Sequence, residues 1–436
     1  MLFKNYFKLP RFIAGALLTG TVLLGARFFW FTRSFAGTLP YMDQLELYWP
    51  FIHNPSPLSL FLYQYGPHRQ GMGYILTYAV AAVSQWNIPT EITLNALVQI
   101  GTCIALLALK RAVFHRWHIT DIFIPLVVFS YRYTESFTIV PNISLAVFPI
   151  FLTFLGIYVW FILTTPWKYA LTAAIAVIVL FSGFGMLTLP LFALLICVPL
   201  FRFPNSDIKY AHIITPLLIL ISGTSAFFYN YQFDPAVSCQ VNPLIDWPVY
   251  SSFIGTEVTS YFIRPNSLLP LHGEYLGLTV WISLGILLGL SVNSYWQNNH
   301  RSYHGIHIVL LGIPVLFAAA SAFARTCLGV EAARAGRYAI FFIPGLISLY
   351  FLLLRFKGML ARGTLIAFVS LFMLNEVVVS RGYTEVAKNH YQSMERWHTC
   401  YTQHSSIPYC NDVTQFSLIP ARMNTMAGEI LRHIVR

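Results

Sequence analysis

Long apolar runs separated by short polar segments recur along the whole chain. A run of about 17–25 apolar residues is long enough to cross the hydrocarbon core of a bilayer as a helix. Hydrophobic residues make up 57% of the 436 residues and charged residues only 10%, whereas soluble chains carry about 25% charged residues. The sequence therefore predicts an all-α polytopic membrane protein and excludes soluble, disordered and disulfide-scaffold classes.

Eleven runs are predicted to span the membrane. They cover residues 12–32, 94–109, 121–131, 142–163, 169–182, 184–200, 211–230, 278–295, 306–324, 338–354 and 364–379. The first lacks a clear cleavage site and ends in an aromatic run, so we interpret it as a retained span rather than a signal peptide. An odd number of spans places the two termini on opposite sides of the membrane.

The apolar stretch 72–86 is the ambiguous segment. Counting it as a span would place Lys110, Arg111 and Arg116 outside, against the rule that inner loops collect cations. We therefore predict that it lies along the outer interface, within one long first loop, residues 33–92, that contains interfacial helices.

Charge supports this topology. The inner segments then hold thirteen Lys or Arg and two Asp, so they carry the whole net charge of +11, while the outer side is neutral. The thirteen cations are Lys4, Lys8, Arg11, Lys110, Arg111, Arg116, Lys168, Arg202, Lys209, Arg301, Arg355, Lys357 and Arg362. Membrane orientation thus explains the basic balance better than nucleic-acid binding does, and we predict no nucleic-acid partner.

The predicted organisation is a transmembrane module, residues 1–380, followed by a small outer tail, residues 381–436. Outer loops 33–92 and 231–277 are long enough to fold, and residues 427–435 are predicted to form a short amphipathic helix. Four of the six cysteines fall on the outer side, where Cys400 and Cys410 can close a small loop in an oxidising compartment. The sequence has no CxxC motif and no zinc-ligand spacing, so no cofactor or metal is predicted.

Ionisable residues near membrane depth are costly and usually functional. In the first outer loop, Asp43 and Glu46 are three residues apart, so a helix would present both carboxylates on one face. His68 and Arg69 follow in the same loop. At the water–lipid boundary, a carboxylate can act as a general base and His68 or Arg69 can bind an anion. The alternative is a solvated loop that contacts lipid headgroups.

Two further clusters lie at the ends of short spans. Arg132 and Glu135 end the short third span, which suggests that they are recessed toward a cavity; the alternative is a surface ion pair. Residues 181–190 hold two glycines and a serine at a tight turn, which either lets backbone approach a substrate or only closes a hairpin.

A fourth cluster precedes the tenth span and consists of Arg325, Glu331, Arg334, Arg337 and Tyr338. Arginines grouped in this way suit a phosphate or pyrophosphate clamp, and Arg264 of the second long loop can join them. The alternative is that they snorkel to lipid headgroups.

The pattern resembles the GT-C class of membrane glycosyltransferases, which includes protein O-mannosyltransferases and aminoarabinose transferases. The acidic first outer loop with Asp43 and Glu46, the following His68-Arg69 pair, the hairpin 181–190 and the Gly336-Arg337-Tyr338 start of a late span look like features of that class. The chain departs from it in lacking an Asp-Glu dipeptide and a His-Pro-Pro motif in the first loop.

The resemblance implies a bacterial inner-membrane enzyme with a cytoplasmic N-terminus and a periplasmic C-terminus. Such an enzyme moves a sugar from a polyprenyl-phosphate donor to a lipid-linked or cell-envelope acceptor by an inverting displacement. Asp43 would be the base, with Glu46 or Glu135 assisting, and Arg337, with Arg334 or Arg69, would hold the phosphate. Membrane lipids, the donor and a lipid or glycan acceptor are the partners it implies.

Three alternatives belong to other classes. A flippase or transporter of lipid-linked saccharide would show polar residues along the middle of several spans. An O-antigen polymerase or ligase would rely on arginines in one large outer loop, and a non-catalytic scaffold would use its charges as headgroup anchors. Charges concentrated at one surface, and the early carboxylates, favour the transferase.

Overall fold

Helices make up most of the computed structural model, which describes residues 8–53, 55–139, 143–165, 167–202, 210–232, 246–262, 273–297, 301–418 and 424–434. In this part of the chain the strands are two residues long: β1 (Gln64–Tyr65) pairs antiparallel with β2 (His68–Arg69). Gly66 turns the chain between them with a φ of +54°, a conformation that glycine adopts without strain.

The α-helices are α2 (Lys8–Ser34), α3 (Asp43–His53), α4 (Pro57–Leu62), α5 (Gly71–Val83), α6 (Ile88–Phe114), α7 (Phe123–Val128), α8 (Phe148–Ile162), α9 (Trp167–Leu180), α10 (Leu189–Arg202), α11 (Tyr210–Phe228), α12 (Trp247–Phe262), α13 (Gly273–Trp296), α14 (Arg301–Arg325), α15 (Ile343–Arg355), α16 (Met359–His404), α17 (Ile407–Thr414) and α18 (Asn424–Ile434). The short 3₁₀ or π-helical segments are η1 (Ile119–Ile122), η2 (Tyr131–Tyr133), η3 (Glu135–Ile139), η4 (Ile143–Val147), η5 (Gly183–Leu187), η7 (Thr326–Leu328), η8 (Val330–Arg334) and η9 (Gly336–Phe342).

Membrane-crossing helices dominate the fold. Within the described residues, seven helical stretches are long and apolar enough to cross a membrane: Arg11–Ser34, Ile88–Phe114, Ile143–Ile162, Gly273–Trp296, Ser302–Leu328, Gly336–Arg355 and Met359–His404. Three other predicted spans correspond to shorter apolar helices, Trp167–Leu180, Gly183–Pro199 and Ile214–Phe228. These helices confirm the prediction of an all-α multi-pass membrane protein. The total of eleven crossings stays a prediction.

The segment 121–131, which the sequence predicts as a short span, is not one continuous α-helix. It is divided among η1, the six-residue α7 and η2, and every side chain of α7 is buried. Backbone that departs from a regular helix leaves polar groups unpaired, so at membrane depth it is tolerated only where protein surrounds it. The neighbouring helices of the bundle provide those surroundings.

The stretch 72–86 forms α5 and the turn that follows it. With 13 residues, α5 is about 20 Å long, which is shorter than the roughly 30 Å hydrocarbon core of a bilayer. Gly73 allows close packing on η4, because a Cβ at this position would lie 2.8 Å from the Cα of Ser144. The length of α5 agrees with the predicted interfacial helix.

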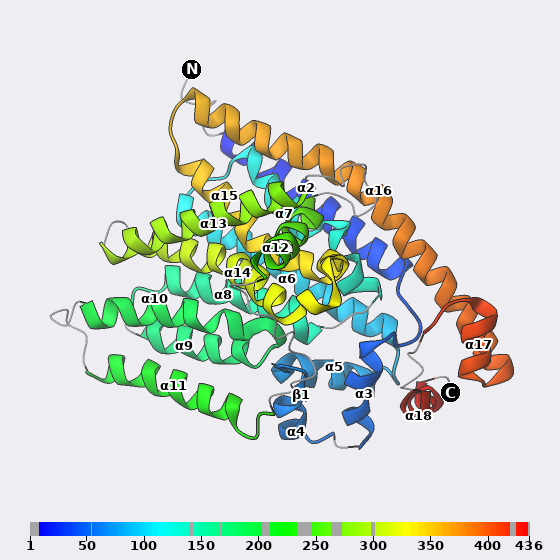
Figure 1. Cartoon of the computed structure of the whole chain (residues 1–436). Helices are drawn as coiled ribbons and strands as arrows, with labels where there is room; N and C mark the ends of the chain where they lie inside the picture. Colours follow the sequence, from blue (N-terminus) through cyan, green and yellow to red (C-terminus); the bar gives the residue numbers. More distant parts are fainter. Residues whose placement is uncertain are drawn as a thin grey trace.

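The longest helix, α16, runs beside α2 along one side of the molecule (Figure 1). Arg27 of α2 donates a 2.7 Å hydrogen bond to the hydroxyl of Ser380 in α16. The 46 residues of α16 extend about 69 Å, far more than a bilayer needs. The predicted boundary between membrane module and tail, at residue 380, falls inside this helix, so the tail continues the last span without a break.

A second hydrophobic core lies at the far end of α16 and joins the first long loop to the tail. We call this unit the cap and define it as residues 36–92 and 394–431. Its buried members include Leu45, Tyr48, Met394, Trp397 and Ile430. Thr38 donates a 2.9 Å hydrogen bond to Glu395, and the amphipathic helix predicted near the C-terminus is present as α18, which packs on α3.

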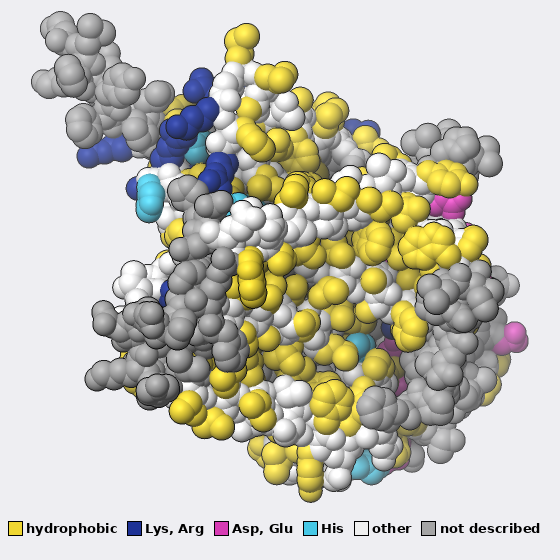
Figure 2. All heavy atoms as spheres, turned by 60° about the vertical axis from the view of Figure 1, so that its left-hand side comes forward, with side chains coloured by type: hydrophobic (Ala, Val, Ile, Leu, Met, Phe, Trp, Pro, Cys, Tyr) yellow, Lys and Arg dark blue, Asp and Glu magenta, His cyan; other side chains and the backbone are white. Residues whose placement is uncertain are grey.

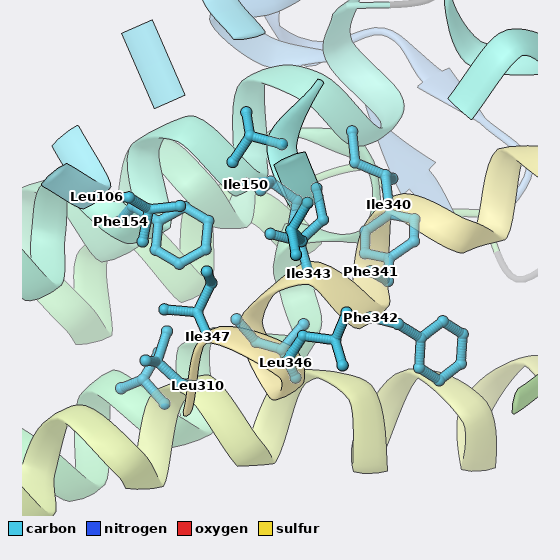
Figure 3. Close-up of a cluster of buried hydrophobic side chains, with 14 of the residues drawn as sticks. Leu106, Ile150, Phe154, Leu310, Ile340, Phe341, Phe342, Ile343, Leu346 and Ile347 are labelled. Atoms are coloured by element: carbon cyan, nitrogen blue, oxygen red, sulfur yellow. The ribbon is translucent and has the colours of Figure 1, made fainter. Parts of the chain in front are cut away.

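The main core lies among the long helices. Figure 3 shows Leu106 of α6, Phe154 of α8 and Leu310 of α14 around the turn from η9 into α15, which supplies Ile340 and Ile347. This turn is packed from several sides, so the residues just before it, Gly336 to Tyr338, are held in a fixed position.

Ion pairs also occur inside the bundle. The buried Lys110 ammonium forms an ion pair with Asp121, and Tyr350 donates a 2.6 Å hydrogen bond to the same carboxylate. On the surface, Lys and Arg gather at one end of the face in Figure 2 and Asp and Glu on the opposite side, with hydrophobic side chains between them. This separation agrees with the predicted charge asymmetry.

A disulfide joins Cys400 of α16 to Cys410 of α17, as the sequence allows. Closing a loop of this size should stabilise the cap by about 2–3 kcal/mol. Replacing both cysteines by Ser should therefore lower the thermal stability of the protein and expose residues 400–418 to proteolysis. Cys197→Ser, which removes a free thiol, is the control; equal resistance of the double variant and the wild type would contradict this role.

Candidate functional site

Within the cap, the carboxylates of the first loop lie at the start of α3. Asp43 is its first residue and Glu46 lies one turn later, so both face the same way. The backbone amide of Met42 donates a 3.3 Å hydrogen bond to the carbonyl of Leu418, which fixes the start of the helix against the tail. Both carboxylates are half-buried.

Two tyrosines of the β1 region face these carboxylates. Burial, and then the charges of Asp43 and Glu46, raise the pKa of the Tyr65 hydroxyl, which also hydrogen-bonds to Glu46. Burial, and then Glu46, raise the pKa of Tyr63 to about 12. Both hydroxyls therefore remain protonated at neutral pH and act as hydrogen-bond donors beside the acids.

Arg337 links this acidic face to the bundle. Its Nη1 lies 3.1 Å from Glu135 Oε1, and its backbone N–H donates a 3.2 Å hydrogen bond to Glu135 Oε2. Asp43 also interacts electrostatically with the Arg337 guanidinium. A Cβ at position 336 would lie 3.3 Å from the Glu135 carboxylate, so glycine leaves it room to approach. The side chains of Arg337 and Glu135 are 34% and 22% exposed, so the pair remains accessible from outside.

A second arginine, Arg325, lies near the ring of Tyr338, which Arg337 also contacts. The guanidinium carbons of Arg325 and Arg337 lie 5.2 and 5.7 Å from the ring centroid of Tyr338. Beside Arg325, the buried Glu257 of α12 accepts a 2.5 Å hydrogen bond from Ser321. Burial raises the pKa of Glu257 well above its usual range, against the opposing effects of Ser321 and Arg325.

His68 approaches Arg325 from the β2 strand. The imidazole is buried, its ring lies 4.2 Å from that of Phe184, and the backbone of Gly183 hydrogen-bonds to it. Burial, and then the charge of Arg325, lower the pKa of His68 to about 3, although the hydrogen bond to Gly183 opposes the shift. The imidazole is therefore neutral at physiological pH and cannot serve as a cation for phosphate.

Three buried polar atoms around Arg325 have no hydrogen-bond partner in the described part of the chain: His68 Nδ1, Glu257 Oε1 and Tyr338 Oη. Each belongs to a residue that interacts electrostatically with Arg325. Buried polar atoms in folded proteins are almost always hydrogen-bonded to protein or to ordered water. The arrangement therefore suits a polar ligand or bound water at this point.

The structure thus brings together Asp43, Glu46, Glu135, His68, Arg337 and Tyr338 among the predicted site residues. Arg325 was expected in the arginine cluster with snorkelling as its alternative, and it lies over Tyr338 instead.

Four other predicted residues are placed differently. Arg69 is buried and donates hydrogen bonds to the carbonyls of Leu62, Phe227 and Tyr229, so it closes the end of α11. Arg132 does not pair with Glu135; its Nε lies 3.6 Å from Glu376 of α16, and its Nη1 donates to the carbonyl of Tyr261. Arg334 pairs with Glu331 on the surface, and Arg264 lies outside the described residues.

The turn at residues 181–190 contacts His68, through the Gly183 backbone and the Phe184 ring. It does not place its backbone beside Asp43 and Glu46. Gly183 has a φ of +48°, and a Cβ there would lie 2.5 Å from the Cα of Leu145, so two backbone segments meet at this glycine. Sequence reasoning missed Tyr63, Tyr65 and Glu257. Glu257 does carry a signal, since it is the sole charged residue in the otherwise uncharged helix Trp247–Phe262.

Within the described residues, no group of three or more His, Cys, Asp or Glu side chains is arranged to hold a metal ion. A scan against models of known protein families finds no matching model, and a search of curated proteins finds no matching relative.

The buried His68 should make the protein less stable in acid. Its pKa is about 3 in the folded state and about 6.5 when unfolded, so between these values the unfolded chain binds the extra proton and stability rises with pH. We expect a slope of up to about 1.4 kcal/mol per pH unit from this residue. Detergent-based unfolding of the wild type and His68→Gln between about pH 4 and 7 measures it. His404→Gln, on the exposed end of α16, is the control; identical slopes for wild type and His68→Gln would refute the assignment.

Proposed function

We propose that the protein is a membrane glycosyltransferase of the GT-C type that uses a polyprenyl-phosphate-linked sugar. The observation that carries the proposal is the electrostatic contact of Asp43, from the cap, with Arg337, from the bundle. Glu46 shares Tyr65 with Asp43, and Arg325 shares the ring of Tyr338 with Arg337. Transfer from a sugar phosphate needs a base for the acceptor and cations for the leaving group.

In the proposed reaction, the acceptor hydroxyl approaches the anomeric carbon on the side away from the phosphate. Asp43 takes the hydroxyl proton while the oxygen forms the new glycosidic bond, and the bond between the anomeric carbon and the phosphate oxygen breaks. The polyprenyl phosphate leaves with the electron pair, and the anomeric configuration inverts. Glu46, which accepts a hydrogen bond from Tyr65, orients the acceptor.

The cationic side of the site is assigned to Arg325 and Arg337 rather than to Arg69 or Arg334, whose guanidinium groups are engaged elsewhere. Glu135 holds Arg337 in place through two hydrogen bonds. The unpartnered Tyr338 hydroxyl lies beside both arginines and would donate to a phosphate oxygen. Guanidinium groups bind phosphate oxygens in a planar, bidentate manner, which suits this task.

The proposal includes the orientation of the chain: eleven crossings of a bacterial inner membrane, a cytoplasmic N-terminus and a periplasmic cap. Two observations support it. The cap contains the Cys400–Cys410 disulfide, which is typical of an oxidising compartment. Lys and Arg gather toward one end of the molecule (Figure 2), as the retention of cations on the cytoplasmic side requires.

The activity is tested in membranes that contain the overproduced protein, supplied with a polyprenyl-phosphate sugar labelled in the sugar. A transferase releases free polyprenyl phosphate and moves the label to an acceptor. A flippase or transporter moves the donor across the bilayer without releasing it, and a polymerase or ligase that uses diphosphate-linked glycans leaves this donor intact. A scaffold does none of these. Failure to release polyprenyl phosphate with any donor would refute the proposal.

Replacing Asp43 by Asn should lower the transfer rate by about 10²–10⁴-fold, because the amide cannot accept the proton. The rate at which labelled sugar moves to the acceptor in membranes measures the effect. Asp412→Asn removes a carboxylate from an exposed position in the same cap and should leave the rate unchanged. Normal transfer by Asp43→Asn together with loss in Glu46→Gln would move the base to Glu46, and normal transfer by both would exclude the first loop from the chemistry.

A further inference from the structure

A groove of about 890 Å³ opens between α2 and α16, away from the candidate site. Its volume lies within the range of sites that hold small molecules and lipid fragments. The residues that line it divide into an apolar end, which includes Leu126, Met373, Leu374 and Val377, and a polar end, which includes Arg27, Arg381, Thr384 and Lys388.

The two ends follow one face of α16. Leu374, Val377, Arg381 and Lys388 recur at helical spacing, so their side chains point the same way. From Leu374 to Lys388 the helix rises about 21 Å, which is close to half the roughly 40–45 Å thickness of a bilayer with its headgroups. Leu374 and Val377 are well exposed in the protein, at 66% and 59%.

The charges at the polar end are mostly positive. Arg27, Arg381 and Lys388 line it together with one exposed acid, Glu385. The other acid that lines the groove, Glu376, is buried and paired with Arg132. Arg27 is held by its hydrogen bond to Ser380 and by its position 4.3 Å over the ring of Tyr131. The groove therefore offers one cation that is held in place, Arg27, and two exposed cations, Arg381 and Lys388, beside an exposed apolar surface.

A wall of protein separates this groove from the candidate site. The η2 turn forms it: Tyr131 lines the groove, whereas the carbonyl oxygen of Arg132 faces Gly336, next to Arg337. An occupant of the groove is therefore not the reacting end of the proposed donor.

We propose that this groove binds one anionic phospholipid of the leaflet on the cap side. The phosphate lies among Arg27, Arg381 and Lys388, and an acyl chain runs down over Val377 and Leu374. Charge complementarity selects an anionic headgroup over a zwitterionic one, because cations at the membrane surface attract anionic lipids. The apolar end selects a lipid over free phosphate, since the exposed side chains are covered by hydrocarbon. The bound lipid would tie α16 to α2 at the level where α16 leaves the membrane.

The test uses the full chain in phosphatidylcholine vesicles that contain phosphatidylglycerol with a photoactivatable acyl chain. Cross-linked peptides from residues 370–378 or 123–128 are expected in the wild type. In the double variant R381Q/K388Q, the yield of cross-linked peptides should fall about tenfold. The charge-preserving variant R381K/K388R should keep the wild-type yield. Both positions are exposed, so the variants should fold; an intact Cys400–Cys410 disulfide and unchanged thermal unfolding verify this.

R396Q, which removes an exposed arginine from the same helix beyond the groove, is the matched control and should keep full labelling. Equal labelling by a photoactivatable phosphatidylcholine would show an unselective apolar surface and overturn the proposal. So would unchanged labelling in R381Q/K388Q, or an equal loss in R396Q. Inorganic phosphate should not compete; competition by phosphate alone would identify a soluble anion as the occupant and also overturn it.

Discussion

Pairing of charge inside a lipid-embedded bundle is the constraint on which this structure depends. An isolated ion at membrane depth costs several kcal/mol, so the chain can keep charge there only with a partner of opposite sign. Lys110 meets Asp121 near one end of the bundle, and Arg132 meets Glu376 near the other. The second pair joins two segments that are far apart in the sequence, η2 and α16, so the requirement for pairing also fixes how these segments are arranged.

The second pair is costly because it is incomplete. Arg132 Nε and Nη2 have no hydrogen-bond partner in the described part of the chain, although the guanidinium also lies over the rings of Tyr261 and Phe372. Removing one partner from a buried pair typically destabilises a protein by about 3–5 kcal/mol. The Arg132–Glu376 ion pair holds the η2 turn against α16, and this turn leads directly to Glu135. The position of Glu135, and through it that of Arg337, thus depends on an ion pair outside the candidate site.

The sequence is informative about residues whose chemistry is unusual for their surroundings. Apolar runs predict the long helices, and sorting of charge predicts that α5 does not cross, because both depend on the energy of transfer into lipid. The same logic identifies Asp43, Glu135 and Arg337, since each is a charge at a predicted interface. It does not reveal that the helix at 121–131 is divided, because burial among neighbouring helices permits a break in the backbone that hydropathy cannot indicate.

Residue type alone does not reveal what an arginine binds. Arg69 follows a histidine in an outer loop and so resembles an anion-binding residue, yet its donors go to carbonyls at the end of α11, some 160 positions further along the chain. Those carbonyls have no helical partners of their own, so they compete with any external anion for the guanidinium. Such a partner is set by tertiary packing, and no local pattern of sequence indicates it. Glu376 escaped prediction for the same reason, because its partner lies in a turn of another span.

The candidate site is assembled from two bodies, and this determines how it can work. Asp43 and Glu46 come from the cap, whereas Arg325, Arg337 and Glu135 come from the bundle. The relative position of base and cations therefore depends on how the cap sits, which is set by α16 extending into it and by the packing of α18 on α3. A 3.3 Å contact between His53 Nε2 and Glu429 Oε1 also joins those two helices. In the proposed transferase, the C-terminal tail would then help to position the base. A truncated chain that ended at residue 380 would keep every proposed reacting group and lose the support that holds Asp43 beside Arg337.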